Sequence, residues 1–346
     1  LTAFWLRRAR RLLPAMVAVT AGTMAVASVA QPERLAELRH DAVAALGYHL
    51  NWRLILDQQS YFEGAEGPSA LEHLWSLSIE EQFYLVFPLL CVFVLTRWTR
   101  RRAVAVALGG ALAATVLRLV LYDTTVDPSR VYFGTDTRAS GLLLGVAFGL
   151  FWTPNRLRPR SSPRFTRALD RVAVAGAAVL AWYTLALDEH RVTAFRGGFT
   201  AAQIATLALI AVAVYPAPTR TVRVLSVRPL RWLGQRSYGI YLIHWPVIVF
   251  LSAAPGEQPE GPGMVAVQLA LILGLAALSY RLIELPIRRR GLGDAVRHAS
   301  VRLAGLVQGR PMAATSMAVG CVVALGFTLG VTRDVVTASS SEVDQP

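Results

Sequence analysis

The residues best suited to acid–base chemistry lie at the start of an apolar segment, in the run His73-Leu74-Trp75-Ser76-Leu77-Ser78-Ile79-Glu80-Glu81-Gln82-Phe83-Tyr84. On a helix, Ser76, Glu80 and Tyr84 are four residues apart and share a face. Two adjacent carboxylates in apolar surroundings are costly to ionise together. Glu80 and Glu81 are therefore candidates for general acid–base work or for orienting a histidine. A helix start at a membrane interface, with glutamates near its positive end, accounts for the same pattern.

Four more residues in apolar segments carry chemistry: Asp136, Arg138, His244 and Glu284. Asp136 and Arg138 could pair with each other or with charges on a neighbouring helix, and a structural ion pair is the alternative to a function. His244 follows Tyr241 by three residues, so the two face one way, but a histidine among aromatic residues can also serve packing alone. Glu284 ends an apolar segment, where a helix end with polar side chains reaching to the interface is the alternative.

Four arginines, Arg7, Arg8, Arg10 and Arg11, precede the first apolar segment. Arginine pairs with phosphate in a bidentate way, so this cluster is a candidate phosphate clamp. The alternative is topogenic charge beside anionic lipid. The sequence contains no Walker motif, GxGxxG loop, HExxH or CxxC, so we expect neither nucleotide hydrolysis nor a metal site.

The elements that must position these residues are transmembrane helices. Hydrophobic residues make up 54% of the 346 residues and charged residues only 16%, against about 25% charge in a soluble domain. Several apolar stretches reach the roughly 20 residues that cross a bilayer. The sequence predicts an all-α, polytopic transmembrane bundle with about nine spans: 12–30, 74–96, 103–122, 132–152, 172–187, 199–215, 238–253, 264–284 and 313–330. The stretch 38–56 is more polar and is predicted to be an interfacial or re-entrant segment.

The connecting loops alternate in charge. All 35 basic residues are arginine, and 25 of them lie in loops 1–11, 97–102, 153–171, 216–236 and 285–312. The other loops hold seven arginines and 16 acidic residues. The positive-inside rule places the first set in the cytoplasm, so the N-terminal end is cytoplasmic and the C-terminal end extracellular. Topology thus explains the net charge of +13, and we expect no nucleic-acid partner.

Several runs together resemble the acyltransferase-3 family of integral membrane acyltransferases. They match the family's motifs in order over residues 4 to about 290. The runs are His73 to Tyr84, Phe4-Trp5-Leu6-Arg7-Arg8-Ala9-Arg10-Arg11-Leu12-Leu13-Pro14, Tyr132-Phe133-Gly134-Thr135-Asp136-Thr137-Arg138-Ala139, Leu233-Gly234-Gln235-Arg236-Ser237-Tyr238-Gly239-Ile240-Tyr241-Leu242-Ile243-His244-Trp245-Pro246 and Glu284-Leu285-Pro286-Ile287-Arg288.

The resemblance implies a multi-pass enzyme of the plasma membrane, surrounded by lipid, that moves an acyl group, most simply acetyl, to a hydroxyl of a cell-envelope glycan or glycolipid. The donor is a cytoplasmic acyl-CoA, used as a substrate rather than held as a permanent cofactor. Its phosphates bind the four arginines that precede the first span. The residues that orient or pair with the reacting groups are Glu80, Glu81, Asp136, Arg138, His244 and Glu284.

The resemblance also predicts how the domains are organised. Residues 1–290 form the acyltransferase-3 domain, 291–312 a basic cytoplasmic loop, 313–332 a further span, and 333–346 an extracellular linker toward an SGNH-type domain. Family members begin with a helix that carries a histidine thought to be catalytic, followed by a second helix. Neither helix is in this chain, so we expect two spans upstream of Leu1 and about eleven spans in a full-length protein.

Two other classes of function fit parts of the sequence. A transporter of a lipid-linked or amphipathic solute would also have many spans and charges within them, although the hydropathy pattern lacks internal symmetry. A non-catalytic membrane scaffold is the third class.

Overall fold

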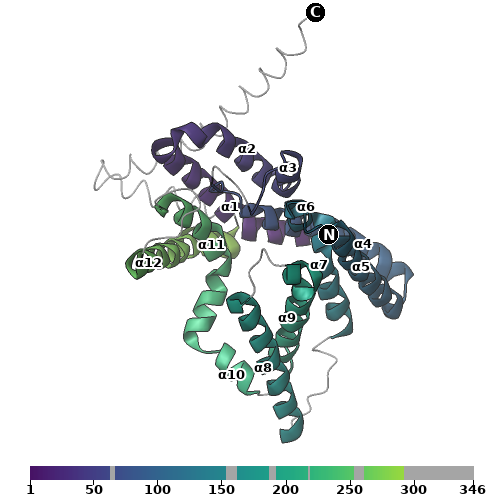
Figure 1. Ribbon diagram of the computed structural model, residues 1–346. Coiled ribbons are helices and arrows are strands. Elements are labelled where there is room, and N and C mark those ends of the chain that lie inside the picture. Colours follow the sequence, from purple (N-terminus) through teal and green to yellow (C-terminus); the bar gives the residue numbers. More distant parts are fainter. Residues whose placement is uncertain (63–66, 153–161, 187–191, 217–218, 253–260, 292–346) are drawn as a thin grey trace, which may run out of the picture. The chain divides into compact units, whose positions relative to one another are not determined.

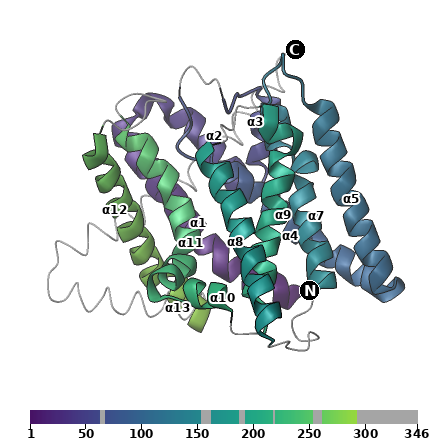
Figure 2. The same ribbon diagram turned by 60° about the horizontal axis from the view of Figure 1, so that its bottom comes forward.

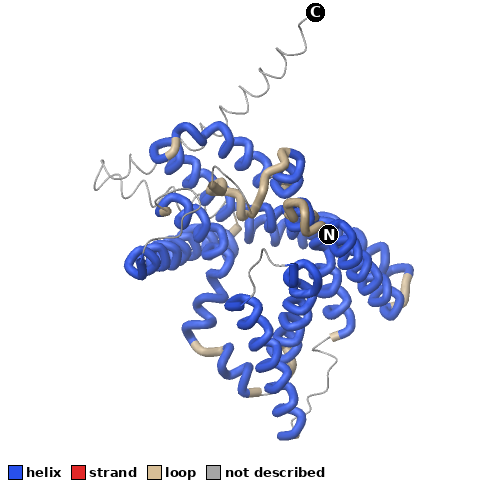
Figure 3. The backbone as a smooth tube through the Cα atoms, in the orientation of Figure 1, coloured by secondary structure: helices blue, strands red, loops and turns tan. Residues whose placement is uncertain are grey.

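The computed structural model describes residues 1–62, 67–152, 162–186, 192–216, 219–252 and 261–291. Every regular element within these residues is a helix, and turns or loops connect the helices (Figure 3). This confirms the all-α fold class predicted from the sequence. The predicted span 313–330 lies outside the described residues.

Six helical segments of the described chain are long and apolar enough to cross a membrane: Thr2–Ala30, Leu74–Val94, Arg100–Leu121, Pro163–Leu185, Ala194–Ala213 and Gly261–Arg289. Two further predicted spans are helical but are not among the six. Helix α7 (Thr135–Phe151) has only 17 residues, and α11 (Arg228–Leu251) carries charged and polar side chains from Arg228 to His244. The chain is therefore a multi-pass membrane protein, and its total of nine spans stays a prediction.

The described residues form two compact units. Unit 1 consists of Leu1–Leu46, Pro68–His73 and the described residues from Arg236 onward, and unit 2 consists of Gly47–Gly67 and Leu74–Gln235. The helices of unit 1 are α1 (Thr2–Ala30), α2 (Leu35–Leu46), most of α11, α12 (Gly261–Ser279), a π-helical turn (Tyr280–Glu284) and α13 (Leu285–Arg290). Those of unit 2 are α3 (Leu50–Leu56), α4 (Leu74–Arg97), α5 (Arg100–Leu121), α6 (Ser129–Phe133), α7, α8 (Pro163–Ala186), a π-helical turn (Ala194–Gly198), α9 (Phe199–Ala213) and α10 (Arg220–Leu225).

In unit 1, helix α11 contacts both α1 and α12 (Figure 2). The Tyr238 hydroxyl donates a 2.9 Å hydrogen bond to the carbonyl of Leu12 on α1. On the other side, a Cβ added to Gly239 would lie 3.6 Å from the Cα of Ala276 on α12. Small residues let helix backbones approach closely within a bilayer, where the hydrophobic effect does not drive helices together.

In unit 2, α5 packs along α7, α7 contacts α9, and α9 packs along α8 (Figures 1 and 2). The buried face of α5 is a stripe of alanines three or four residues apart, from Ala103 to Ala114. A Cβ at Gly176 of α8 would lie only 2.9 Å from the carbonyl oxygen of Ala205 on α9. Close backbone packing of small residues therefore builds this unit as well.

Two predicted segments differ from the structure in detail. The stretch 38–56 is not one segment but the two helices α2 and α3, separated at a turn where Tyr48 has a φ of +56°. The span predicted from residue 132 begins at Thr135, because Gly134 is extended and separates α6 from α7. Hydropathy marks the apolar stretch and misses such breaks within it.

Candidate active site

A buried carboxylate lies at one end of unit 1. Glu284 ends the π-helical turn after α12, and only 4% of its surface is exposed. A Cβ at Gly239 would lie 3.1 Å from Glu284 Oε1, so the glycine makes room for the carboxylate. The cations that act on Glu284 are Arg288, Arg11 and Arg236. Arginines from α1, α11 and α13 therefore favour the ionised form of Glu284, which burial alone would disfavour.

The predicted phosphate-binding residues lie at the same end of unit 1 as Glu284. Arg7, Arg10 and Arg11 are exposed at the start of α1, and Arg8 is half-buried. The guanidinium carbon of Arg236 lies 4.6 Å from the centroid of the Tyr280 ring, which fixes its side chain by a cation–π contact. Arg236 and Arg288 therefore join this cluster, although the sequence did not single them out as donor-binding residues.

A second cluster of unit 1 contains two histidines, His73 and His244. His244 Nδ1 is 2.6 Å from the carbonyl oxygen of Tyr241. Because a carbonyl can only accept a hydrogen bond, Nδ1 carries the proton in the neutral ring and Nε2 keeps its lone pair. The His73 ring lies 5.4 Å from the His244 ring and 5.4 Å from the Tyr241 ring, centroid to centroid. The Tyr241 hydroxyl donates to the carbonyl of His73.

His73 was not predicted as a site residue, although it opens the run that contains Glu80 and Glu81. Burial, and next the charge of His244, lower its pKa to about 3, while a hydrogen bond with the backbone of Leu242 acts in the opposite direction. His73 is therefore neutral at physiological pH. The contact between His73 and α11 could not be predicted from sequence spacing, because the two are about 170 residues apart in the chain.

The loop that carries His73 is held between α2 and α11. Ser69 Oγ donates a 2.5 Å hydrogen bond to Asp41 Oδ2, and Trp245 Nε1 donates a 2.9 Å bond to the carbonyl of Ser69. Asp41 is fully buried. Burial, and next the charge of Asp41, raise the pKa of Glu72 to about 8. The loop that carries His73 thus also carries the carboxyl of Glu72, which is protonated at neutral pH.

We expect Glu72→Gln to stabilise the protein by an amount that grows with pH. The unfolded chain ionises Glu72 near its ordinary pKa of 4.5, whereas the folded protein keeps the proton to about pH 8. As the pH rises from 4.5 to 8, the free energy of unfolding of the parent therefore falls relative to that of the variant. Below pH 4.5, Glu72 is protonated in both states, and it adds no pH dependence. Thermal unfolding of parent and variant at pH 5, 6.5 and 8 checks this, because the effect of His73 cancels in the difference. A difference that does not change with pH contradicts it.

In unit 2, Asp136 and Arg138 do not pair with each other. Arg130 of α6 forms a bidentate ion pair with Asp136, with distances of 3.1 and 2.8 Å. Arg138 Nε instead donates to the carbonyl of Tyr132 at 2.9 Å, and its guanidinium carbon lies 4.2 Å from the centroid of that ring and 5.3 Å from the centroid of Trp75. Asp136 is thus a partner within the α6–α7 corner, and Arg138 lies in an aromatic environment.

The run that contains Glu80 and Glu81 forms the first turns of α4. Glu80 is exposed and Glu81 is half-buried. The next residue, Gln82, donates to Asn51 Oδ1 at 2.9 Å and accepts from Thr135 Oγ1 at 2.7 Å. The side chain that ties α4 to α3 and α7 is therefore Gln82, which the sequence did not predict as a site residue. The two glutamates stay candidates for an orienting role.

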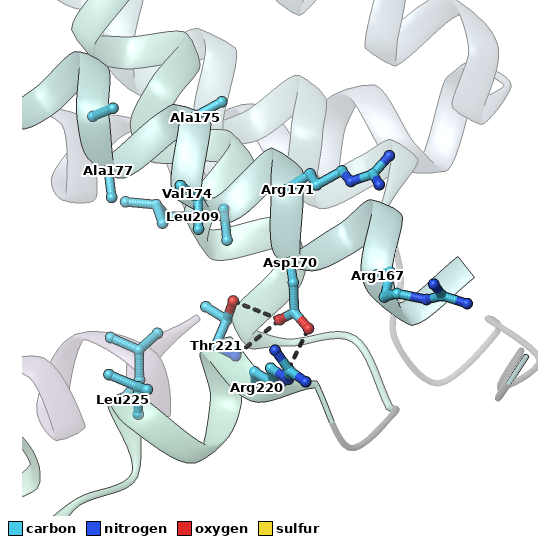
Figure 4. A pocket seen from close by; sticks show the side chains of 13 residues that line it. Arg167, Asp170, Arg171, Val174, Ala175, Ala177, Leu209, Arg220, Thr221 and Leu225 are labelled. Carbon is cyan, nitrogen blue, oxygen red and sulfur yellow. Dashed lines mark hydrogen bonds between the residues drawn. The ribbon is translucent and has the colours of Figure 1, made fainter. Parts of the chain in front are cut away.

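A groove of about 710 Å³ lies on unit 2 between α8, α9 and α10 (Figure 4). Its carboxylate, Asp170, accepts two hydrogen bonds from Thr221 and one from the backbone of Arg220, and so holds α10 against α8 (Figure 4). None of the predicted site residues lines this groove. The clusters described above, each within its own unit, are therefore the candidate sites rather than the groove.

Comparison with known proteins identifies relatives of the chain. The Acyl_transf_3 family model, described as an acyltransferase domain, matches residues 1–284. O-acetyltransferase OatA of Staphylococcus aureus is 38% identical over 291 residues, which are 83% of this chain and 47% of that protein. Peptidoglycan O-acetyltransferase OatA of Listeria monocytogenes is 35% identical over 99% of this chain and 55% of its own length. The YrhL protein of Bacillus subtilis is 40% identical over 86% of this chain and 47% of its own length.

The chain spans about half the length of the curated relatives that it matches. No solved structure matches it.

Proposed function

Because the chain belongs to the acyltransferase-3 family, we propose that it transfers an acetyl group from cytoplasmic acetyl-CoA to a hydroxyl of a cell-envelope glycan. The observation that carries this proposal is the family match over residues 1–284, together with relatives that are named O-acetyltransferases. Peptidoglycan is the proposed acceptor, since it is in the name of the Listeria relative.

The donor is proposed to bind at the arginine end of unit 1. Arg7, Arg8, Arg10 and Arg11 offer the bidentate donors that suit the phosphates of acetyl-CoA. Glu284, in its ionised form, would attract Arg11 and Arg236. This arrangement leaves the remaining guanidinium donors to the ligand and lowers the side-chain entropy lost on binding.

In the transfer step, the glycan hydroxyl oxygen attacks the thioester carbonyl carbon. The carbon–sulfur bond breaks, and the hydroxyl proton ends on the sulfur of coenzyme A. We assign the relay of this proton to His244 Nε2. His73 and Tyr241 position the His244 ring. Glu80, Glu81 and Arg138 stay candidates for orienting the acceptor.

Replacing both Arg10 and Arg11 with glutamine is expected to raise the KM for acetyl-CoA about tenfold or more, because charge-assisted hydrogen bonds to phosphate are lost. The measurement is acetyl transfer to glycan by membranes that contain the full-length protein. Arg101→Gln with Arg102→Gln is the matched control, because both arginines are exposed at the start of α5 and belong to the same predicted cytoplasmic set. An unchanged KM in the Arg10 and Arg11 variant removes these residues from the donor site. Movement of a solute without ester formation favours the transporter.

A further inference from the structure

Two arginines of unit 2, Arg118 and Arg138, gather at one end of three neighbouring helices. Arg118 lies one turn before the end of α5, Arg138 lies one turn after the start of α7, and Phe199 begins α9. The guanidinium carbons lie 5.5 Å (Arg118) and 4.5 Å (Arg138) from the centroid of the Phe199 ring. One aromatic ring thus contacts both cations.

Arg118 is almost completely buried, with 1% of its surface exposed. Its Nη2 donates a 2.8 Å hydrogen bond to Thr200 Oγ1. Its Nε and Nη1 have no hydrogen-bond partner among the described residues. A guanidinium has five N–H donors, and buried donors are normally satisfied. An acceptor is therefore missing on this side of Arg118.

Neither guanidinium has a carboxylate within 4.0 Å in the described part of the chain. The nearest candidate by sequence, Asp136, already binds Arg130 through both oxygens. The charge that acts on Arg118 most strongly is that of Arg138, which repels it. Charges inside a membrane protein normally pair, and an intramembrane arginine by default indicates function. Two like charges around one ring therefore favour an anion between them.

We propose that Arg118 and Arg138 together bind the anionic group of the glycan acceptor, a carboxylate or a phosphate. This rests on the proposed function. The fork of Nε and Nη on a guanidinium matches either group in a bidentate way. In the sequence, residue 118 is followed by the predicted loop 123–131, and residue 199 is preceded by the predicted loop 188–198. Both belong to the acid-rich set that the charge distribution predicts to be extracytoplasmic, which is the side of a cell-envelope glycan.

Binding of three acceptors to the purified full-length protein, without acetyl-CoA, tests the site. The acceptors are a neutral chito-oligosaccharide, a peptidoglycan fragment with free carboxylates, and a glycan linked to a lipid diphosphate. We expect Arg118→Gln and Arg138→Gln to weaken binding of an anionic acceptor at least tenfold and to leave the neutral one unchanged. If the variants lose binding of the peptidoglycan fragment, the site binds a carboxylate. If they lose binding of the lipid-linked glycan, it binds a phosphate. Arg118→Lys keeps the charge without the bidentate fork and is expected to have an intermediate effect.

Arg97→Gln is the matched control, since Arg97 also lies over an aromatic ring, with its guanidinium carbon 4.2 Å from the Phe93 centroid, but is exposed. Equal losses for neutral and anionic acceptors overturn the proposal. A second variant, Asp188→Asn with Glu189→Gln, changes two acids outside the described residues. The same loss of anionic-acceptor binding in this variant also overturns the proposal, because the chain itself would then supply the anion that pairs with the arginines. If the parent binds acceptors with this selectivity but transfers no acetyl group, the proposed function fails and the anion site stands.

Discussion

His244→Gln is expected to slow acetyl transfer about 100-fold or more, because loss of a general acid–base commonly costs that much. The Tyr241 carbonyl accepts from Nδ1 and so leaves Nε2 as the basic nitrogen of the ring. Glutamine keeps a polar side chain but cannot take a proton. The measurement is kcat for transfer to glycan, together with the amount of protein in the membrane, which should stay at the parent level.

His40→Gln is the control for this variant, because His40 lies in unit 1 as well but is exposed on α2. It should transfer at the parent rate. If His244→Gln also keeps the parent rate, or loses activity only because the protein no longer accumulates, His244 is a packing residue among aromatic side chains.

Glu284→Gln is expected to raise the KM for acetyl-CoA about tenfold and to change kcat much less. The variant removes the carboxylate that interacts with Arg11, Arg236 and Arg288. These arginines are then held less well in the positions that bind phosphate, so their hydrogen bonds to the donor are weaker. Steady-state kinetics over a range of acetyl-CoA concentrations separate the two constants.

Gly239→Ala is the matched variant for Glu284. It crowds the carboxylate, since its Cβ would lie 3.1 Å from Oε1, but keeps the charge. We expect a smaller rise in KM than for Glu284→Gln. Loss of kcat with an unchanged KM in Glu284→Gln would falsify the positioning role and place Glu284 in the reaction itself.

The helices could be predicted from the sequence because hydropathy is a local property. Eight predicted spans coincide with described helices, and the all-α class is confirmed. Their ends could not be predicted as well. Helix α1 runs from Thr2 through the arginine cluster, because a helix does not stop where hydropathy does. The break at Gly134 depends on the packing of α6, which no single segment encodes.

Side-chain partners were harder to predict than helices. Asp136 pairs with Arg130 because the corner at Gly134 turns α6 back toward α7, whereas spacing alone pointed to Arg138. His73 reaches His244 only through the loop that Ser69 and Asp41 anchor. Both contacts depend on tertiary structure. The candidate positions on α11 and in the π-helical turn after α12 could be found in advance because charged and titratable residues are rare in apolar segments.

Acetyl transfer by membrane vesicles of known orientation that contain the protein tests the proposed function most directly. Labelled acetyl-CoA, which does not cross a bilayer, is added outside inside-out and right-side-out vesicles. With a cytoplasmic donor site, we expect alkali-labile label on glycan from the inside-out vesicles, where the cytoplasmic face is exposed, and none from intact right-side-out vesicles. Equal labelling from both orientations contradicts a cytoplasmic donor site, and no labelled glycan in either contradicts acetyl transfer itself.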